Sequence, residues 1–283
     1  MKRIIGLILV AVVLTMVFTA CGLTKNVPDA ERKSDTASET GNVDNSFAVI
    51  KAKGKIIVGL DDSFPPMGFR DEKNEIVGFD IDMAKAVAEI MGVEVEFKPI
   101  VWDNKMLELN GNNIDLIWNG FTVTPERESQ VLFSKPYLEN RQIIIVLKDS
   151  GITKKADLAG KKVGLQGGSS AEDALKSDEK TFASIGEKNV KRYEDNLTAL
   201  MDLDNKRIDA VVMDEVVCKY QISKKAEKYI ILDESFGEEV YAVGARLTDK
   251  ALIVEIDSAL AKLKENGKAA EISKKWFGSD IVK

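Results

Sequence analysis

The sequence predicts an α/β protein of two lobes, because two parts of the chain repeat the same order of motifs. Each part opens with a short apolar strand after Gly-Lys, first at 54–60 and again at 160–165. Each part later carries an Ile-Asp pair in front of another apolar run, at 114–115 and at 208–209. Apolar runs that alternate with helical patterns indicate βα units and parallel sheets. Chance recurrence of common βα dipeptides is the alternative explanation.

In the first half of the chain, strands and helices alternate after a polar N-terminal region. The helix near 81–91 has one apolar face, and Gly92 is a typical residue at a helix end. In order, we expect a strand at 55–60, a helix that reaches Met91, a strand at 93–97, a short helix through Leu107 and Leu109, a strand at 114–118, a helix that starts at Thr124, and a strand at 142–147.

The second half continues the alternation of strands and helices. Ser170 is suited to cap a helix, and Glu172 and Asp173 suit its positive end. In order, we expect a strand at 162–165, a helix from Ser170, a helix at 196–203, a strand at 208–213, strands at 229–232 and 240–243, and one or two amphipathic helices over 250–276.

Composition excludes several classes of site. The chain has 283 residues and is 45% hydrophobic, which allows cores for one large or two medium domains. The formal net charge is -6 and no basic stripe is present, so nucleic acid is not an expected partner. The chain has no histidine, which excludes Ser–His–Asp and Cys–His catalysis and argues against zinc. We expect no metal and no cofactor.

The N-terminus has the pattern of a targeting segment. A basic start at Lys2-Arg3 precedes an apolar run at 4–18 and the small-residue end Thr19-Ala20-Cys21. The pattern resembles a bacterial lipoprotein signal, in which 1–20 are removed and Cys21 carries lipid, palmitate included; an uncleaved membrane anchor is the alternative. The polar stretch 21–46 predicts a flexible tether. Both interpretations place the folded part outside the cytoplasm, at the cell membrane.

The stretch at 114–127 combines a strand, a turn and a helix start. The strand breaks at Gly120, and Thr124-Pro125 is typical of an N-cap and first helical position. Arg127 follows one turn into that helix. Free N–H groups and a guanidinium together suit a small carboxylate. An ordinary strand–turn–helix with a surface arginine is the alternative.

Polar or aromatic side chains follow several predicted strands. Ligands of parallel sheets bind outside the carboxyl ends of the strands, so two facing lobes would form a cleft there. Plainer roles also fit: a turn residue for Asp61, a helix cap for Asp214, and core aromatics for Phe64 and Trp102. The residues that strand ends alone would place in this cleft are Asp61, Phe64, Asn119, Gln166, Ser169 and Asp214.

The same positions carry a family resemblance that covers 55–278. The motifs are Asp61-x-x-Phe64-x-Pro66-Met67, Gly78-Phe79-Asp80-Ile81-Asp82, Ile114-Asp115-Leu116, Gly120-x-Thr122-x-Thr124-x-Glu126-Arg127, Phe133-Ser134-x-Pro136-Tyr137 and Lys274-Lys275-Trp276-Phe277-Gly278. Together they resemble the family 3 solute-binding proteins of amino-acid ABC importers. The resemblance implies a two-lobe, type II periplasmic-binding-protein fold with two crossover hinge strands. Lobe 1 would comprise 47–140 plus 238–283, and lobe 2 would comprise 141–237.

The resemblance also implies roles for single residues. Arg127 would bind the ligand α-carboxylate with help from Thr122, and Ser169 or Ser170 would donate N–H groups from lobe 2. Asp214 and the Gly120 carbonyl would accept the α-ammonium, so a zwitterion would drive closure. Phe64 and Trp102 would sandwich the ligand side chain, and Asp61, Asn119, Gln166 and Met213 would select it.

The function implied is capture of a free L-amino acid for delivery to an ABC permease, by a protein expected to be a monomer. Asp61 and Asn119 disfavour an acidic ligand. We expect a polar amino acid such as cystine or glutamine, with a basic one open through Asp61. The alternatives are a dehydratase-like enzyme of the same fold, with Glu215 as general acid, and a sensing module, disfavoured because no output domain follows 276–278. Cys218 is expected to be buried and inert.

Overall fold

The computed structural model describes residues 44–223 and 225–283. The predicted signal segment and Cys21 lie outside these residues, as does most of the predicted tether. Asp44 and Ser46 were expected in the tether, but Ser46 begins helix α1 (Ser46–Lys53). Asp44 Oδ2 accepts a 2.5 Å hydrogen bond from Ala251 N, and Ser46 Oγ accepts one of 3.1 Å from Leu252 N. The folded part therefore starts earlier than predicted, because these side chains satisfy backbone donors at the start of a later helix.

Lobe 1 is built on a five-stranded sheet in the order β5-β1-β6-β13-β7. Parallel pairing joins β1 to β5 and β6, and β13 runs antiparallel to β6 and β7. The strands are β1 (Lys55–Leu60), β5 (Glu94–Pro99), β6 (Leu116–Ile117), β7 (Val131–Phe133) and β13 (Gly244–Arg246). A small sheet that we did not predict comprises β2 (Ser63–Phe64), β3 (Gly68–Arg70) and β4 (Ile76–Val77).

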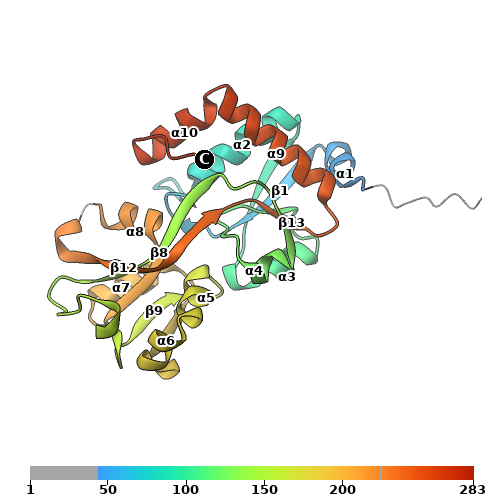
Figure 1. Cartoon of the computed structure of the whole chain (residues 1–283). Helices are drawn as coiled ribbons and strands as arrows, with labels where there is room; N and C mark the ends of the chain where they lie inside the picture. The colour runs from blue at the N-terminus through green and yellow to red at the C-terminus, as the bar shows by residue number, and fades with distance from the viewer. Residues whose placement is uncertain (1–43, 224) are drawn as a thin grey trace, which may run out of the picture. The chain divides into compact units, whose positions relative to one another are not determined.

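Helices cover this sheet. Figure 1 shows α1, α2, α9 and α10 grouped together, and these helices contact one another. The C-terminal region forms two helices rather than one, because Gly267 adopts a left-handed φ of 79° between them. The remaining helices of lobe 1 are short. The bounds are α2 (Phe79–Met91), η1 (Trp102–Asn104), α3 (Lys105–Asn110), α4 (Pro125–Glu128), α9 (Lys250–Glu265) and α10 (Lys268–Phe277).

Lobe 2 is built on a second five-stranded sheet, in the order β10-β9-β11-β8-β12. Its strands are β8 (Leu138–Leu147), β9 (Val163–Gln166), β10 (Val190–Tyr193), β11 (Ala210–Asp214) and β12 (Tyr229–Tyr241). Its helices are η2 (Lys155–Leu158), α5 (Ser170–Ser177), α6 (Glu179–Ile185), η3 (Glu187–Asn189), α7 (Asn196–Asp204), α8 (Glu215–Ile222) and η4 (Ala226–Lys228). Among the described residues, no helix combines the length and apolar character needed to span a membrane.

The repeated Ile-Asp motif has the same structure in both lobes. Asp115 N donates to Ile57 O at 2.8 Å, and Asp115 Oδ2 accepts from Ile57 N at 2.9 Å. Asp209 N donates to Lys162 O at 2.8 Å, and Asp209 Oδ2 accepts from Lys162 N at 2.8 Å. Asp115 therefore ties β1 to the start of β6, and Asp209 ties the start of β9 to the start of β11. The sequence repeat is structural rather than a chance recurrence.

Two crossover strands, β8 and β12, connect the lobes. They pair antiparallel from Leu138 with Tyr241 to Leu147 with Tyr229, with two register shifts between these ends. Two short strands at 229–232 and 240–243 were predicted; residues 229–232, 240 and 241 are in a strand, but they belong to the single strand β12, and 242–243 lie beyond its end. The acidic segment between them hides the strand pattern, but β8 still pairs with it through register shifts near Ser235. The predicted lobe boundaries at 140/141 and 237/238 fall inside these strands and stay a prediction.

Candidate functional site

A small cavity of about 10 Å³ lies between the loops of the two lobes. It is close to the carboxyl ends of β1, β6, β9 and β11. Ligands of open α/β sheets bind in the crevice outside such strand ends. Every residue that lines it was among those expected from the sequence. They are Phe64, Trp102, Asn119, Gly120 and Arg127 from lobe 1, and Gln166, Ser169, Ser170 and Asp214 from lobe 2.

Arg127 is buried in this cavity and fixed by its neighbours. Thr124 is the N-cap of α4, and its Oγ1 accepts a hydrogen bond from Arg127 N at 3.2 Å, as predicted. The guanidinium donates to Thr122 O at 2.9 Å and to Gly168 O at 3.2 Å, and it lies 4.9 Å from the centre of the Phe121 ring. Burial lowers the pKa of Arg127, but guanidinium stays charged in proteins. The alternative of a surface arginine is wrong.

The loop of lobe 2 that faces Arg127 leads into helix α5. Ser169, rather than the predicted Ser170, occupies the N-cap position. Its hydroxyl donates to Gln166 O at 2.7 Å instead of capping the helix. The first N–H groups of a helix have no intrahelical acceptor, so this end of α5 adds donors beside the guanidinium. The Ser170 hydroxyl lies 3.0 Å from Thr122 Oγ1, which joins the two lobes.

Asp214 ends strand β11 and is buried opposite Arg127. It sits at the N-cap position of α8, but its side chain makes no capping hydrogen bond, so that alternative is wrong. Instead Oδ1 accepts from Asn140 Nδ2 at 2.8 Å, Gln142 Nε2 at 2.9 Å and Tyr241 OH at 2.6 Å. Burial raises the pKa of Asp214 to about 8, and the nearby Glu239 carboxylate adds to the shift.

Asn140, Gln142 and Tyr241, which donate to Asp214, were not predicted. The neighbouring Glu239 was not predicted either. They lie on the crossover strands β8 and β12. Asn140 and Gln142 are two residues apart in β8, which places both on one buried face of the strand, whereas the residue between them is only half-buried. That spacing is the signal in the sequence that could have identified them.

Asp61, Asn119 and Gln166 form one hydrogen-bonded group. Gln166 Nε2 donates to Asp61 Oδ2 at 2.6 Å, and Asp61 N donates to Asn119 Oδ1 at 3.2 Å. Asp61 Oδ1 also accepts from Ser63 N at 2.9 Å, so the turn role holds as well. Burial raises the pKa of Asp61. Within 44–223 and 225–283, no lysine or arginine forms an ion pair with it.

Lys105 is a buried cation that the sequence analysis missed. Its Nζ donates to Gly168 O in lobe 2 at 2.7 Å and to Trp102 O at 3.2 Å, and lies 5.2 Å from the Trp102 ring centre. Burial, together with the nearby charge of Arg127, lowers the pKa of Lys105 to about 8. The Gly168 carbonyl therefore accepts from Lys105 and Arg127, both from lobe 1. We call this contact the Gly168 clasp.

Other predicted residues have different positions. Met213 is fully buried in the hydrophobic core and does not line the cavity. Gly120 has a left-handed φ of 57°, and its N–H donates to Asp80 Oδ2 at 2.7 Å. A Cβ at Gly120 would lie 2.9 Å from Phe64 Cε1, so glycine is required for both reasons.

Glu215 and Cys218 were considered as reactive side chains, and the structure places both in unreactive surroundings. Glu215 accepts two hydrogen bonds of 2.8 Å from Arg141, which lower its pKa and leave no proton to donate. Cys218 is buried in α8 as predicted, and burial raises the pKa of its thiol to about 12. In the described part of the chain, no three His, Cys, Asp or Glu side chains are grouped to hold a metal ion.

Comparison with known proteins identifies consistent relatives. The family model described as "Bacterial extracellular solute-binding proteins, family 3" matches residues 56–279. L-cystine-binding protein TcyJ of Escherichia coli strain K12 is 30% identical over 236 residues, which cover 83% of this chain and 86% of TcyJ. Arginine-binding extracellular protein ArtP of Bacillus subtilis strain 168 is 31% identical over 275 residues, 96% of each protein.

A solved structure shares the fold. The substrate-binding protein of an ABC uptake transporter from Streptococcus pneumoniae, with bound histidine, superimposes with a TM-score of 0.82 at 37% identity. The match covers 85% of this chain and 98% of that one. The predicted two-lobe fold is thereby confirmed.

Proposed function

Because the chain belongs to the bacterial extracellular solute-binding proteins of family 3, we propose that its interlobe cavity captures one free polar amino acid for an ABC importer. Proteins of this family are binding proteins of ABC transporters and not enzymes. The relatives named above are binding proteins too, and Glu215 is held by Arg141. The dehydratase alternative therefore has no support.

One observation supports the amino-acid ligand most strongly. Arg127 of lobe 1 and Asp214 of lobe 2 line the same cavity, and both are buried. An α-carboxylate fits the guanidinium, because planar bidentate pairing suits a carboxylate. An α-ammonium fits Asp214. Because the two groups come from different lobes, a zwitterion contacts both only in the closed form, and its differential affinity favours closure.

The side-chain class is argued from Asp61, which does not line the cavity itself but accepts a hydrogen bond from the lining residue Gln166. A buried carboxylate without a cationic partner favours a ligand that donates hydrogen bonds or carries positive charge, and it repels a ligand carboxylate. Phe64 and Trp102 add apolar surface to the cavity wall. We propose a polar ligand such as glutamine or cystine, or a basic one such as arginine, and exclude aspartate and glutamate.

A thermal-shift screen of the standard amino acids and L-cystine tests the proposal. A ligand that binds only the folded state stabilises it by about 2.7 kcal/mol at 100 times its Kd. We expect clear stabilisation by one or more neutral polar or basic amino acids. Selection of glutamate or aspartate would contradict the proposed side-chain class, and stabilisation by none would contradict the function.

Location and organisation complete the proposal. We propose that residues 1–20 are removed, that lipid including palmitate is attached at Cys21, and that 21–43 tether the protein to the membrane. We further propose a monomer with lobe 1 at 47–140 plus 238–283 and lobe 2 at 141–237. Incorporation of labelled palmitate by expressing cells, lost in Cys21→Ser, is the result expected. Equal label in the variant would contradict lipidation at Cys21.

A further inference from the structure

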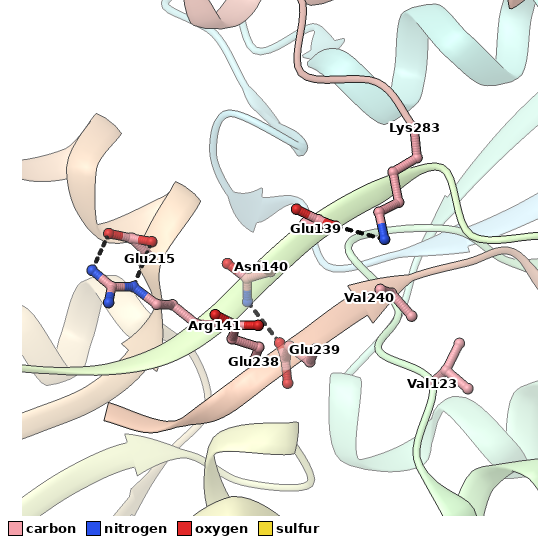
Figure 2. Close-up of a pocket in the computed structure, with 9 residues that line it drawn as sticks. All are labelled: Val123, Glu139, Asn140, Arg141, Glu215, Glu238, Glu239, Val240 and Lys283. Atoms are coloured by element: carbon pink, nitrogen blue, oxygen red, sulfur yellow. Dashed lines mark hydrogen bonds and ion pairs between the residues drawn. The ribbon is translucent and has the colours of Figure 1, made fainter. Parts of the chain in front are cut away.

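Two carboxylates at the hinge share the same hydrogen-bond donors. Asn140 Nδ2 donates to Glu239 Oε1 at 2.6 Å and to Asp214 Oδ1 at 2.8 Å. Gln142 Nε2 lies 2.9 Å from each of the same two oxygens. Figure 2 shows Glu239 on β12 with its carboxylate toward Asn140 on β8. Because both oxygens contact one amide nitrogen, the two carboxylates are close neighbours. We call Asp214 and Glu239 the hinge carboxylate pair.

The pair connects two spaces. Asp214 lines the interlobe cavity, whereas Glu239 lines a wider pocket at the hinge, drawn in Figure 2. The hinge pocket is open toward solvent, so a proton on the pair has a route to water. Its lining residues are Val123, Glu139, Asn140, Arg141, Glu215, Glu238, Glu239, Val240 and Lys283.

The cations that face the pair are bound to other groups. Arg141 is paired with Glu215 at 2.8 Å, and Lys283 with Glu139 at 2.6 Å. Arg127 donates to backbone carbonyls. The donors to the pair are neutral groups: the two amides, Tyr241 OH to Asp214, and Thr122 Oγ1 to Glu239 at 3.0 Å. Glu238 adds a further acid on β12. Asp214 is buried and Glu239 is half-buried. Within the described residues no cation donates a hydrogen bond to either carboxylate, although Arg127 is close enough to act on both. Two neighbouring carboxylates in such a place favour a state in which they hold one proton together.

We propose that the hinge carboxylate pair holds one proton in the empty protein and releases it to solvent when the ligand α-ammonium contacts Asp214. Glu239 is then a positioning residue of the ammonium subsite: together with burial it keeps Asp214 neutral until the ligand arrives. The ammonium keeps its three protons and donates to the ionised carboxylate. The inference rests on the proposed function, because it needs an amino-acid ligand.

Proton release gives binding a defined pH dependence. In the empty protein the pKa of Asp214 is raised to about 8. The ligand cation favours the charged form and lowers that pKa in the complex. Below this raised pKa a binding event therefore releases a proton, and the observed Kd falls as the pH rises, by at most about tenfold per pH unit. Above that pKa this dependence ends.

Titration calorimetry measures the released proton directly. The probe is whichever of L-glutamine, L-arginine and L-cystine binds most tightly, used in phosphate and in Tris buffer at about pH 7. The difference in binding enthalpy between buffers of known protonation enthalpy gives the number of protons. We expect close to one for the parent protein and less than half for Glu239→Gln, because the second carboxylate is gone.

Glu238→Gln is the matched control, since it removes a neighbouring exposed carboxylate from the same strand and pocket, and it should release as many protons as the parent. Equal release by the parent and Glu239→Gln overturns the inference. So does binding by the parent with no buffer dependence and a flat pH profile, which needs no variant; both results leave the proposed function intact. Failure of every amino acid to bind overturns the proposed function and the inference together.

Discussion

Arg127 is held by carbonyl groups rather than by a carboxylate, which leaves its charge available. The distance from Nη2 to the carboxylate of Asp173 is 3.9 Å, at the limit of an ion pair, and that carboxylate is partly exposed. In this closed arrangement the Arg127 guanidinium is buried, so it has already lost most of its contact with water. The residue is therefore organised for an anion that enters the cavity.

Replacing Arg127 with alanine should weaken amino-acid binding by at least about 30-fold. Removing one partner from a buried charge pair costs about 2–5 kcal/mol, and a ligand carboxylate would lose that partner. Titration calorimetry with the amino acid found in the screen measures the change. Arg207→Ala is the control, since Arg207 is exposed and contacts Asp202 on the surface. Unchanged affinity in Arg127→Ala would show that the site is misplaced.

Residues at strand ends were predictable, and buried partners were not. Phe64, Asn119 and Gln166 could be placed together because parallel strands bring their carboxyl ends to one edge. Met213 was predicted to line the cavity, but neighbouring side chains of a strand point to opposite faces. Asp214 therefore lines the cavity, while Met213 points into the core. Lys105 was missed because a lysine in a short polar helix is ordinarily exposed, and only the tertiary contact with Gly168 buries it.

At the scale of elements, the loop between β9 and α5 is held against lobe 1 by the Gly168 clasp. A charge-assisted hydrogen bond is stronger than a neutral one, and the Lys105 bond to Gly168 O crosses between the lobes. The clasp stabilises the closed form specifically. Its contribution should depend on the protonation of Lys105, whose pKa is lowered to about 8.

Lys105→Met should raise the Kd of the amino acid by about tenfold, because a charged hydrogen bond of about 1.5–3 kcal/mol in the closed form is lost while side-chain bulk is kept. Lys98→Met is the control, since Lys98 pairs with Glu108 inside lobe 1. Both variants are compared with the parent by calorimetry at about pH 7. An equal effect of the two substitutions would argue against an interlobe role for Lys105.

Helix α2 brings a second buried acid to the turn at Gly120. Asp80 Oδ2 accepts from Gly120 N at 2.7 Å, and burial raises the pKa of Asp80 to about 7. The unfolded chain ionises this group at about pH 4, so between about pH 4 and 7 the folded state binds more protons. The free energy of unfolding contributed by Asp80 therefore falls as pH rises through this window, by at most about 1.4 kcal/mol per pH unit.

Asp80→Asn should remove this fall, because the amide oxygen can still accept the Gly120 hydrogen bond and does not ionise. Urea unfolding at several pH values between about 5 and 7 measures the slope. Asp82→Asn on the same helix is the control, as Asp82 pairs with Lys275 near the surface. An identical pH slope in Asp80→Asn and the parent would contradict the assignment.

Element boundaries could be predicted where caps or glycines mark them. Gly92 adopts the left-handed conformation that ends α2, and Pro125 follows the N-cap of α4. Strand β12 was not predictable as one element, because its acidic middle lacks the apolar alternation of a strand. Its pairing with β8 is a long-range contact, which local sequence does not encode.

For the whole molecule, the interlobe contacts describe a closed arrangement. The Phe69 and Tyr220 rings meet across the lobes, with centroids 6.0 Å apart. Interlobe hydrogen bonds include those of Lys105 and Arg127 to Gly168 O, Gln166 to Asp61, and Thr122 to Ser170. These hydrogen bonds lie at the cavity or its margin. Water can replace them when the lobes separate, so closure without ligand is weakly favoured and depends on the zwitterion.

Small-angle X-ray scattering should therefore show a smaller radius of gyration after addition of the amino acid found in the screen. Ligand binding shifts the population toward the closed form by its differential affinity for that form. The parent should contract, and Arg127→Ala should not at the same ligand concentration. If Arg127→Ala contracts as much as the parent, closure does not depend on the guanidinium contact.

The pairing of β8 with β12 has a mechanical consequence. The two connectors are hydrogen-bonded to each other on both sides of a register shift, and they are anchored to lobe 1 where Leu138 bridges Val282 and Tyr241 bridges Thr122. Rotation of one connector alone would break these hydrogen bonds, so we expect the two connectors to bend together. Coupled bending leaves few open geometries, and we expect the same faces to meet each time the cleft closes.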